Sequence, residues 1–144
     1  MIKLFSRFHE QSTDKKKAER KAKIGRLGED VAAEFFVSKG YSVVARNLHI
    51  SHLEIDLIIE DASFLVFAEV KTRTAQYKGA SRYGRPASAV NAKKRARIAA
   101  AAEDYLRQHP TDKQPRIDVV EVYVGDAGTL PKVLHIRNAF GAHG

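Results

Sequence analysis

The segment LVFAEVKTR ends an apolar run with two opposite charges, Glu69 and Lys71, two positions apart. Residues two apart in a β-strand point to the same face, so both side chains would lie together near the end of a strand over residues 63–73. An acid two residues before a base is a common spacing, and Glu19 and Lys21 repeat it inside a charged run that has no periodicity. The surroundings must therefore decide what the pair does.

A second acid is expected beside Glu69 on the neighbouring strand. The segments LEIDLIIED and SFLVFAEVKTR are joined by the turn EDAS, which predicts a hairpin with its strands about 4.8 Å apart. We place Asp56 next to Glu69, because apolar residues follow Asp56 immediately. Two carboxylates in a partly apolar setting repel, so one takes up a proton unless a cation lies between them. Their hard oxygens suit Mg²⁺ or Mn²⁺, which makes Asp56 and Glu69 candidate metal ligands.

Two interpretations of this strand end stay open. In the first, Lys71 orients or deprotonates the water that attacks a phosphodiester, or offsets the charge that develops during the attack. In the second, Glu69 forms a structural ion pair with Lys71 or Arg73. Spacing alone favours the ion pair, because such spacings are abundant.

Composition limits the class of protein. The 144 residues are 44% apolar, which suits one domain with one core. The chain has no cysteine, and this excludes a disulfide framework and a thiolate metal site. The start, MIKLFSRFHEQS, has too short an apolar run for a signal peptide, and no later stretch approaches membrane-spanning length. We expect a cytoplasmic protein that does not enter a membrane.

Positive charge is concentrated at the start of the chain. The net charge is +8, and residues 1–23 carry eight Lys or Arg against three acids. We expect residues 1–23 to form a basic, flexible arm and residues 24–144 to form a single domain. Such an arm can contact phosphate backbones, because each neutralised phosphate releases condensed counterions. A solubilising leader is an equally weighted alternative, whereas an anionic membrane surface is less favoured because apolar residues are few.

The hydrophobic pattern predicts an α/β fold with the order α-β-β-β-α-β. The helix before the last strand is a crossover, so the third and fourth strands are expected to be parallel neighbours in a mixed sheet flanked by helices. A fifth strand in KVLHIRNAF is left open, and TAQYKGASRYGRPA is expected to be a mobile loop. The expected helices cover residues 24–39 and 87–109, and the expected strands cover residues 41–47, 53–61, 63–73 and 116–124.

The order and spacing of several segments resemble a known family, the YraN family of predicted endonucleases. The segments are GRLGEDVAAEFF, GYSVVARN, EIDLI, VFAEVKTR, AVNAKKRARIAAAAEDYL and RIDVVEV, over about residues 24–124. That family is similar to archaeal Holliday junction resolvases of the PD-(D/E)XK nuclease superfamily. The resemblance implies a restriction-endonuclease-like core with its active site at the hairpin of the second and third strands. It also implies a metal-dependent endonuclease acting on nucleic acid, with DNA favoured and branched DNA one candidate substrate.

Several residues match the family's motif positions. Asp56 matches the motif aspartate, Glu69 the second acid and Lys71 the motif lysine. Glu29 matches a glutamate of the first helix that faces the site in resolvase-like members, although a first-turn glutamate is also favoured by the helix dipole. Lys93 matches a recurrent lysine of the long helix, with an exposed helix face as the alternative.

The sequence departs from the family pattern at one position. The family has glycine before EID, whereas this chain has Leu53, so the turn into the second strand is in question. His49 and His52 lie nearby, and we interpret them as loop residues rather than ligands, because their spacing matches no zinc pair. Asp118 also matches a family position, for which we expect a structural role.

Nucleic acid is the expected partner, held mainly through its phosphate backbone. The resolvase likeness further implies a homodimer. The alternatives are a nucleic-acid-binding module that keeps the fold without cutting, and an interaction protein whose charged strand end is an ion pair. The expected backbone contacts, besides the arm, come from the loop and the long helix: Lys78, Arg82, Arg85, Lys93, Lys94, Arg95 and Arg97.

Overall fold

The computed structural model describes residues 2–74, 92–126 and 128–139. The observed order, α-β-β-β-α-β-β, confirms the predicted one and adds the fifth strand that the pattern had left open. The predicted loop and the predicted first turns of the second helix lie outside the described residues. The elements are α1 (Ile2–Ser38), β1 (Ser42–Ile50), β2 (Leu53–Glu60), β3 (Phe64–Thr74), α2 (Ala92–Gln108), β4 (Gln114–Val124) and β5 (Lys132–Ile136).

The five strands form one mixed sheet in the order β1-β2-β3-β4-β5. Strands β3 and β4 are parallel, and every other neighbouring pair is antiparallel. The parallel pair is joined by a crossover that contains α2, because parallel strands cannot be linked by a tight turn. This arrangement confirms the predicted α/β class and is compatible with a restriction-endonuclease-like core.

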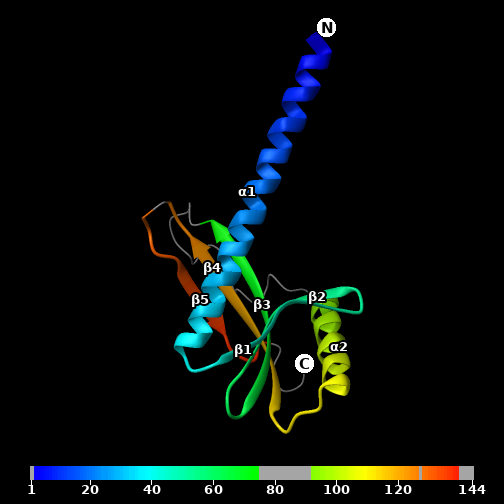
Figure 1. Cartoon of the computed structure of the whole chain (residues 1–144), viewed down its shortest axis with the longest axis vertical. Coiled ribbons are helices and arrows are strands. Elements are labelled where there is room, and N and C mark those ends of the chain that lie inside the picture. The colour runs from blue at the N-terminus through cyan, green and yellow to red at the C-terminus, as the bar shows by residue number, and fades with distance from the viewer. Residues whose placement is uncertain (1, 75–91, 127, 140–144) are drawn as a thin grey trace.

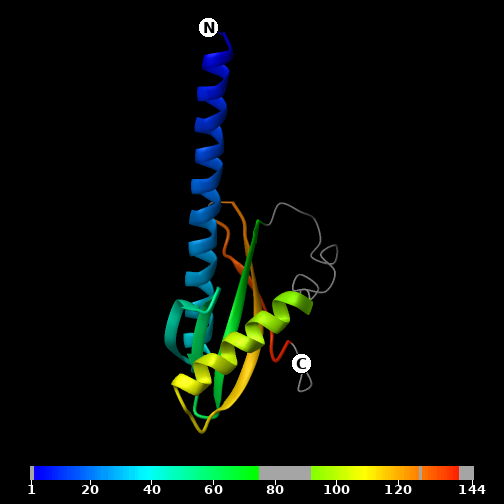
Figure 2. The same cartoon turned by 90° about the vertical axis from the view of Figure 1, so that its right-hand side faces the viewer.

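The two helices cover opposite faces of the sheet (Figure 2). Strand β3 is buried on both faces, so its side chains alternate between two clusters. Val66 and Ala68 join the cluster under α1, whereas Leu65 and Phe67 join the cluster under α2. The helices complete these clusters with Ala32, Ala33 and Phe36 from α1, and with Ile98, Ala101, Ala102 and Tyr105 from α2.

Helix α1 is much longer than the apolar pattern predicts. Apolar residues recur at helical spacing only from Ile24, but the helix begins at Ile2 and projects beyond the sheet (Figure 1). Residues 14–23, DKKKAERKAK, are mostly good helix formers, so intrinsic propensity continues the helix without a buried face. Neither helix in the described ranges is long and apolar enough to cross a membrane. The division into a flexible arm and a single domain stays a prediction.

The contact of α1 with the sheet depends on a glycine. A Cβ on Gly28 would lie 2.8 Å from both Cβ and Cγ2 of Thr72 in β3, and closer still to its hydroxyl oxygen. Gly28, Ala32 and Phe36 recur every four residues and are buried, so they form the face of α1 that meets the sheet. Leu27, the residue before Gly28, lies outside this face and is 44% exposed.

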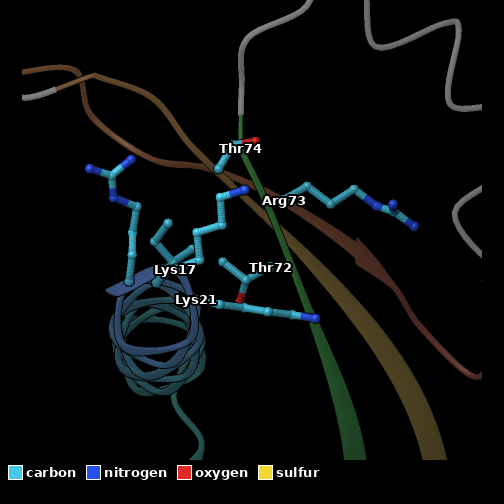
Figure 3. A pocket seen from close by; sticks show the side chains of 7 residues that line it. Lys17, Lys21, Thr72, Arg73 and Thr74 are labelled. Atoms are coloured by element: carbon cyan, nitrogen blue, oxygen red, sulfur yellow. The ribbon is translucent and has the colours of Figure 1, made fainter. Parts of the chain in front are cut away.

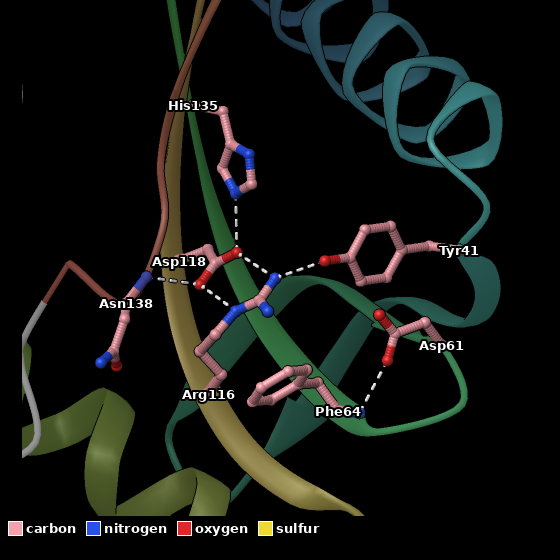
Figure 4. Close-up of polar contacts among 7 residues, drawn as sticks. All are labelled: Tyr41, Asp61, Phe64, Arg116, Asp118, His135 and Asn138. Atoms are coloured by element: carbon pink, nitrogen blue, oxygen red, sulfur yellow. Dashed lines mark hydrogen bonds and ion pairs between the residues drawn. The ribbon is translucent and has the colours of Figure 1, made fainter.

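A buried polar network ties β4 and β5 to the segment after α1 (Figure 4). The Asp118 carboxylate accepts two hydrogen bonds of 2.9 Å from Arg116 and one of 2.8 Å from the backbone N–H of Asn138. His135 Nε2 lies 2.7 Å from the same carboxylate, and Arg116 also donates to the Tyr41 hydroxyl. Burial raises the pKa of Asp118, but its bonds with His135 and Arg116 outweigh burial and hold the pKa below its usual range. The several hydrogen bonds to its carboxylate agree with the structural role expected for Asp118.

The turn into β2 accommodates the residue that departs from the family pattern. The β1–β2 hairpin loop consists of Ser51 and His52, and Leu53 already begins β2. Ser51 adopts a positive φ of 56°, so it is Ser51 rather than residue 53 that takes the left-handed conformation. Strand β1 extends through His49, so the expectation that His49 belongs to a loop was wrong; the strand continues because the hairpin is tight.

Two glycines on α1 allow a matched test of this packing. Gly28→Ala should lower the free energy of unfolding by about 1–3 kcal/mol, because the new methyl group overlaps Thr72. Gly25→Ala should raise it by up to about 1 kcal/mol, because nothing lies within 4 Å of a Cβ there and alanine favours a helix. Urea denaturation of both variants measures the difference. Equal effects from the two substitutions would contradict the close approach at Gly28.

Candidate active site

The candidate site lies where β2 separates from β3. Pairing of the two strands runs from Glu60 and Leu65 to Leu57 and Ala68 and then ends, while β3 continues beside β4. The next free N–H of β3, that of Val70, donates a 2.8 Å hydrogen bond to Asp56 Oδ2. A side chain therefore replaces the strand partner that this partly buried edge would otherwise need.

The regular alternation of β2 breaks at Asp56. A strict alternation would put Glu54, Asp56 and Ile58 on one face and all their odd-numbered neighbours on the other. Instead, Ile55 packs in the cluster under α2, whereas Leu57 packs in the cluster under α1. The prediction that Asp56 lies near Glu69 is met in the structure, but through a hydrogen bond across the opening hairpin rather than through regular alternation.

Asp56 and Glu69 are electrostatically unfavourable neighbours. The pKa of Asp56 is raised from 3.8 to about 7, first by burial and then by the charge of Glu69. The hydrogen bond from Val70 opposes this shift, and the charge of Glu29 on α1 adds the smallest of the contributions. The repelling carboxylate pair that the sequence predicts is therefore present, with Glu29 close enough to influence it.

Glu69 is contacted by two lysines from different elements. Only 8% of its side chain is exposed, and its Oε1 lies 2.5 Å from Lys94 Nζ and 3.6 Å from Lys71 Nζ. Lys71 follows two positions later on β3, whereas Lys94 comes from the first turn of α2. The two ammonium groups and two carboxylates form one coupled cluster between a strand end and a helix start.

The two lysines have pKa values that shift in opposite directions. Burial lowers the pKa of Lys71, and the neighbouring Lys94 ammonium lowers it further. Burial also lowers the pKa of Lys94, but its hydrogen bond and attraction to Glu69 outweigh burial and raise the pKa overall. Lys71 is therefore the lysine that can lose a proton more readily, while Lys94 remains a fixed cation.

A second charged group extends the site along the same face. In the parallel register, Lys71 lies opposite Glu121 and Arg73 lies opposite Tyr123. Glu121 is fully buried; its Oε1 lies 3.5 Å from Arg73 Nε, and its Oε2 accepts a hydrogen bond from the Tyr123 hydroxyl. Arg73 is thus placed at Glu121, not at Glu69, where the ion-pair alternative had placed it. Sequence reasoning missed Glu121, although a lone acid inside the apolar run DVVEVYV is a usable signal.

The structure brings four predicted residues into one cluster, Asp56, Glu69, Lys71 and Lys94, with Glu29 within electrostatic reach. Lys94 had been expected to hold phosphate from an exposed helix face, and sequence reasoning did not predict its contact with Glu69. The residue singled out from the family, Lys93, is exposed. Arg95 and Arg97 are also exposed on α2, whereas Lys78, Arg82 and Arg85 lie outside the described residues.

The donor atoms of the cluster fit a hard divalent cation. Within the described ranges, no group of three or more His, Cys, Asp or Glu side chains is arranged to hold a metal ion. The protein would supply two carboxylates, Asp56 and Glu69, and Mg²⁺ commonly binds one or two carboxylates while keeping several waters. Lys94 Nζ already places one positive charge against Glu69 Oε1.

Known proteins similar to this chain share most of its length. Residues 28–122 match the model of the uncharacterised protein family UPF0102. A UPF0102 protein of Symbiobacterium thermophilum is 46% identical over 121 residues, which is 83% of this chain and 98% of that protein. A UPF0102 protein of Caldanaerobacter subterraneus subsp. tengcongensis is 39% identical over 122 residues, and one of Solibacter usitatus is 42% identical over 119. These matches cover 83% and 81% of this chain, and 96% and 84% of the two relatives.

The raised pKa of Asp56 predicts a pH-dependent stability. Because the folded pKa of about 7 exceeds the unfolded value of 3.8, stability present below about pH 4 is lost as the pH rises to 7 and above. Asn at position 56 cannot ionise but still offers an oxygen to the Val70 N–H. At pH 4 the free energy of unfolding of Asp56→Asn should therefore be about the same as that of wild type. At pH 8 it should be larger than that of wild type by on the order of a few kcal/mol.

Urea denaturation in EDTA across this pH range measures the effect. Asp61→Asn is the matched control, because hydrogen bonds from the Phe64 and Ser63 N–H groups lower the pKa of Asp61. That variant should lose stability relative to wild type as the pH rises, which is the opposite trend. If the free energies of unfolding of wild type and Asp56→Asn differ by the same amount from pH 4 to pH 8, the result would contradict the carboxylate repulsion.

Proposed function

The chain belongs to the uncharacterised protein family UPF0102, also called the YraN family, and we propose that it is a metal-dependent nuclease that hydrolyses phosphodiester bonds of nucleic acid. The proposal rests mainly on one observation, the repelling carboxylates of Asp56 and Glu69 beside two lysines. Such a cluster costs stability, and strongly shifted pKa values gather at functional sites because catalysis uses them.

The carboxylates define the cation site of this proposal. Asp56 and Glu69 would hold Mg²⁺ or Mn²⁺, and Glu29 would act as an accessory acid from α1. When bound, the cation supplies Lewis acidity toward the phosphoryl group and toward an attacking water. A bound cation would also offset the repulsion that, after burial, raises the pKa of Asp56, so the Asp56 carboxylate would be ionised at neutral pH.

The two lysines divide the remaining work. Lys71, whose pKa is lowered by burial and by Lys94, accepts the proton of the attacking water and holds that water in place. Lys94, whose pKa is raised, keeps its charge and offsets negative charge that develops on the phosphoryl oxygens. Opposite pKa shifts in one cluster are the usual basis for such a division of roles.

A second candidate function is a nucleic-acid-binding module that does not cut. The observation that favours it is the 2.5 Å contact between Lys94 Nζ and Glu69 Oε1, which neutralises Glu69 without a metal. The same contact suits an interaction protein in which the cluster is only structural. Cleavage separates the nuclease from the module. Branched DNA as the substrate, and a two-fold dimer, rest on the likeness to resolvases alone.

Cleavage of a labelled panel tests the nuclease proposal. The panel contains junction, flap, single-stranded and duplex DNA together with single-stranded RNA, each incubated with Mg²⁺, Mn²⁺ or EDTA. Wild type should cut at least one substrate only with metal, and Glu69→Gln and Lys71→Met should each lower kcat by roughly 100-fold or more, because ligand and base are lost. Cutting that survives both substitutions would rule out this site, and binding without cutting would favour the module.

Neighbouring lysines on α2 test the role of Lys94. Lys94→Ala should lower kcat by roughly 10- to 100-fold and move the acidic limb of the pH–rate profile to higher pH, because the pKa of Lys71 rises. Lys93→Ala is the control, since this substitution removes the same charge from an exposed residue of the same helix. An unshifted pH profile in the Lys94→Ala variant would contradict the coupling of the two lysines.

A further inference from the structure

A basic groove lies between α1 and the end of β3 (Figure 3). Its volume is about 440 Å³, and its residues come from two elements that are far apart in the sequence. Apart from Arg73, which contacts Glu121, none of its lining residues belongs to the candidate active site. The groove is lined by Lys17, Arg20, Lys21, Ile24, Thr72, Arg73 and Thr74.

The helical wall carries the charge of the groove. Lys17, Arg20, Lys21 and Ile24 follow the i, i+3, i+4, i+7 spacing, so they occupy one face of α1. All three basic residues are exposed, and Lys17 and Lys21 extend from α1 toward the end of β3 in Figure 3. The acid of this segment, Glu19, is not part of the lining. The groove therefore presents three cations at its surface.

The strand wall carries hydrogen-bonding groups. Thr72 and Thr74 lie on the α1 side of β3, as the contact of Thr72 with Gly28 shows. Arg73 runs away from α1 in Figure 3, toward the opposite face, where Glu121 holds its Nε at 3.5 Å. Among the described strands, none pairs with this part of β3 on the β2 side, because β2 pairing stops at Ala68. Hydroxyl and ammonium groups are typical partners of nucleic-acid phosphates.

The groove and the candidate active site meet at the open end of β3, where Lys71 lies on the α2 side of the strand and Thr72 on the α1 side. Thr72 follows Lys71 in β3, Gly28 precedes Glu29 in α1, and Gly28 and Thr72 are in contact. From Glu29 to Lys17 the helix rises by about 18 Å at 1.5 Å per residue. At about 3.4 Å per phosphate along one duplex strand, that length covers roughly five phosphates.

The basic wall precedes the part of the chain that matches the family model. The family match begins at Gly28, so all three cations precede it. The segment of α1 that carries them has no buried apolar face, and good helix formers in residues 14–23 keep it helical along the groove. Core packing therefore does not account for the alignment of these cations with the end of β3.

We propose that the groove of Lys17, Arg20 and Lys21 against the end of β3 binds the phosphodiester backbone of the nucleic-acid strand that enters the candidate active site. This inference rests on the proposed function in taking nucleic acid as the ligand. Three exposed cations spread along more than one helical turn suit a row of phosphates better than a single small anion. The groove has one apolar residue, Ile24, whereas binding to a membrane surface requires an apolar face.

The test compares two triple variants of the full chain that remove the same charge from the same helix. One is Lys17→Ala, Arg20→Ala, Lys21→Ala, and the control is Lys15→Ala, Lys16→Ala, Lys23→Ala, whose side chains do not line the groove. Binding of labelled single-stranded and duplex 30-mers is measured in EDTA from 50 to 200 mM KCl. Alanine preserves helix propensity, and circular dichroism verifies the helix content of both variants.

For duplex DNA, the slope of log K against log salt should become less steep by about two to three units in the groove variant, because each lost phosphate contact removes about 0.9. Its affinity at 100 mM salt should fall by roughly 10- to 100-fold, while the control loses less than about one unit of slope. Equal losses in both variants would overturn the groove in favour of diffuse charge. Unchanged DNA binding by the groove variant, or no DNA binding by wild type, would also overturn it. Binding to anionic vesicles is measured in parallel, and a groove variant that loses vesicle binding but keeps DNA binding would overturn the proposal as well.

The outcomes separate this proposal from the nuclease proposal. If the groove variant loses slope but wild type cuts nothing in the substrate panel, the groove stands and the nuclease fails. If cleavage depends on Glu69 while the groove variant binds like the control, the nuclease stands and the groove fails.

Discussion

The close approach of α1 to the end of β3 at Gly28 positions the polar features of this protein. A hydrogen atom in place of a side chain lets the helix lie against Thr72, and the neighbouring residues of each element then fall into place. Glu29 is brought within electrostatic reach of Asp56, and the preceding turns of α1 form one wall of the basic groove. A candidate catalytic cluster and a candidate path for the substrate backbone thus depend on one packing contact.

The two buried aspartates of the sheet show how differently a folded chain can treat the same carboxyl group. Asp118 has hydrogen bonds from three partners and a lowered pKa, so its charge is stabilised where it lies. Asp56 has one backbone donor, Val70, and a carboxylate neighbour, Glu69, and its pKa rises to about 7. The first arrangement holds β4 and β5 together, whereas the second is relieved only by a proton or another cation. This contrast agrees with the structural role expected for Asp118 and supports the functional role proposed for Asp56.

Local patterns in the sequence determined the order of elements, the parallel pairing of β3 with β4, and the position of the charged strand end. These features follow from periodicity and connection length, which act over short stretches of chain. The neighbouring positions of Asp56, Glu69 and Lys71 were predictable for the same reason, because a tight hairpin fixes which strand ends meet. The likeness to the YraN family added the expectation for Glu29, which no local pattern required.

Tertiary structure alone decided which groups complete the cluster and how their charges balance. Lys94 rather than Lys93 contacts Glu69, because the angle at which α2 crosses the sheet selects one helix face. Glu121 meets Arg73 only through the register of two parallel strands joined by a long crossover. The pKa of Asp56 depends on burial by segments distant in sequence. What the sequence by itself determined was therefore the identity and order of the charged groups. Their contacts and protonation came from the folded chain, because desolvation and Coulomb interactions depend on distances that only packing sets.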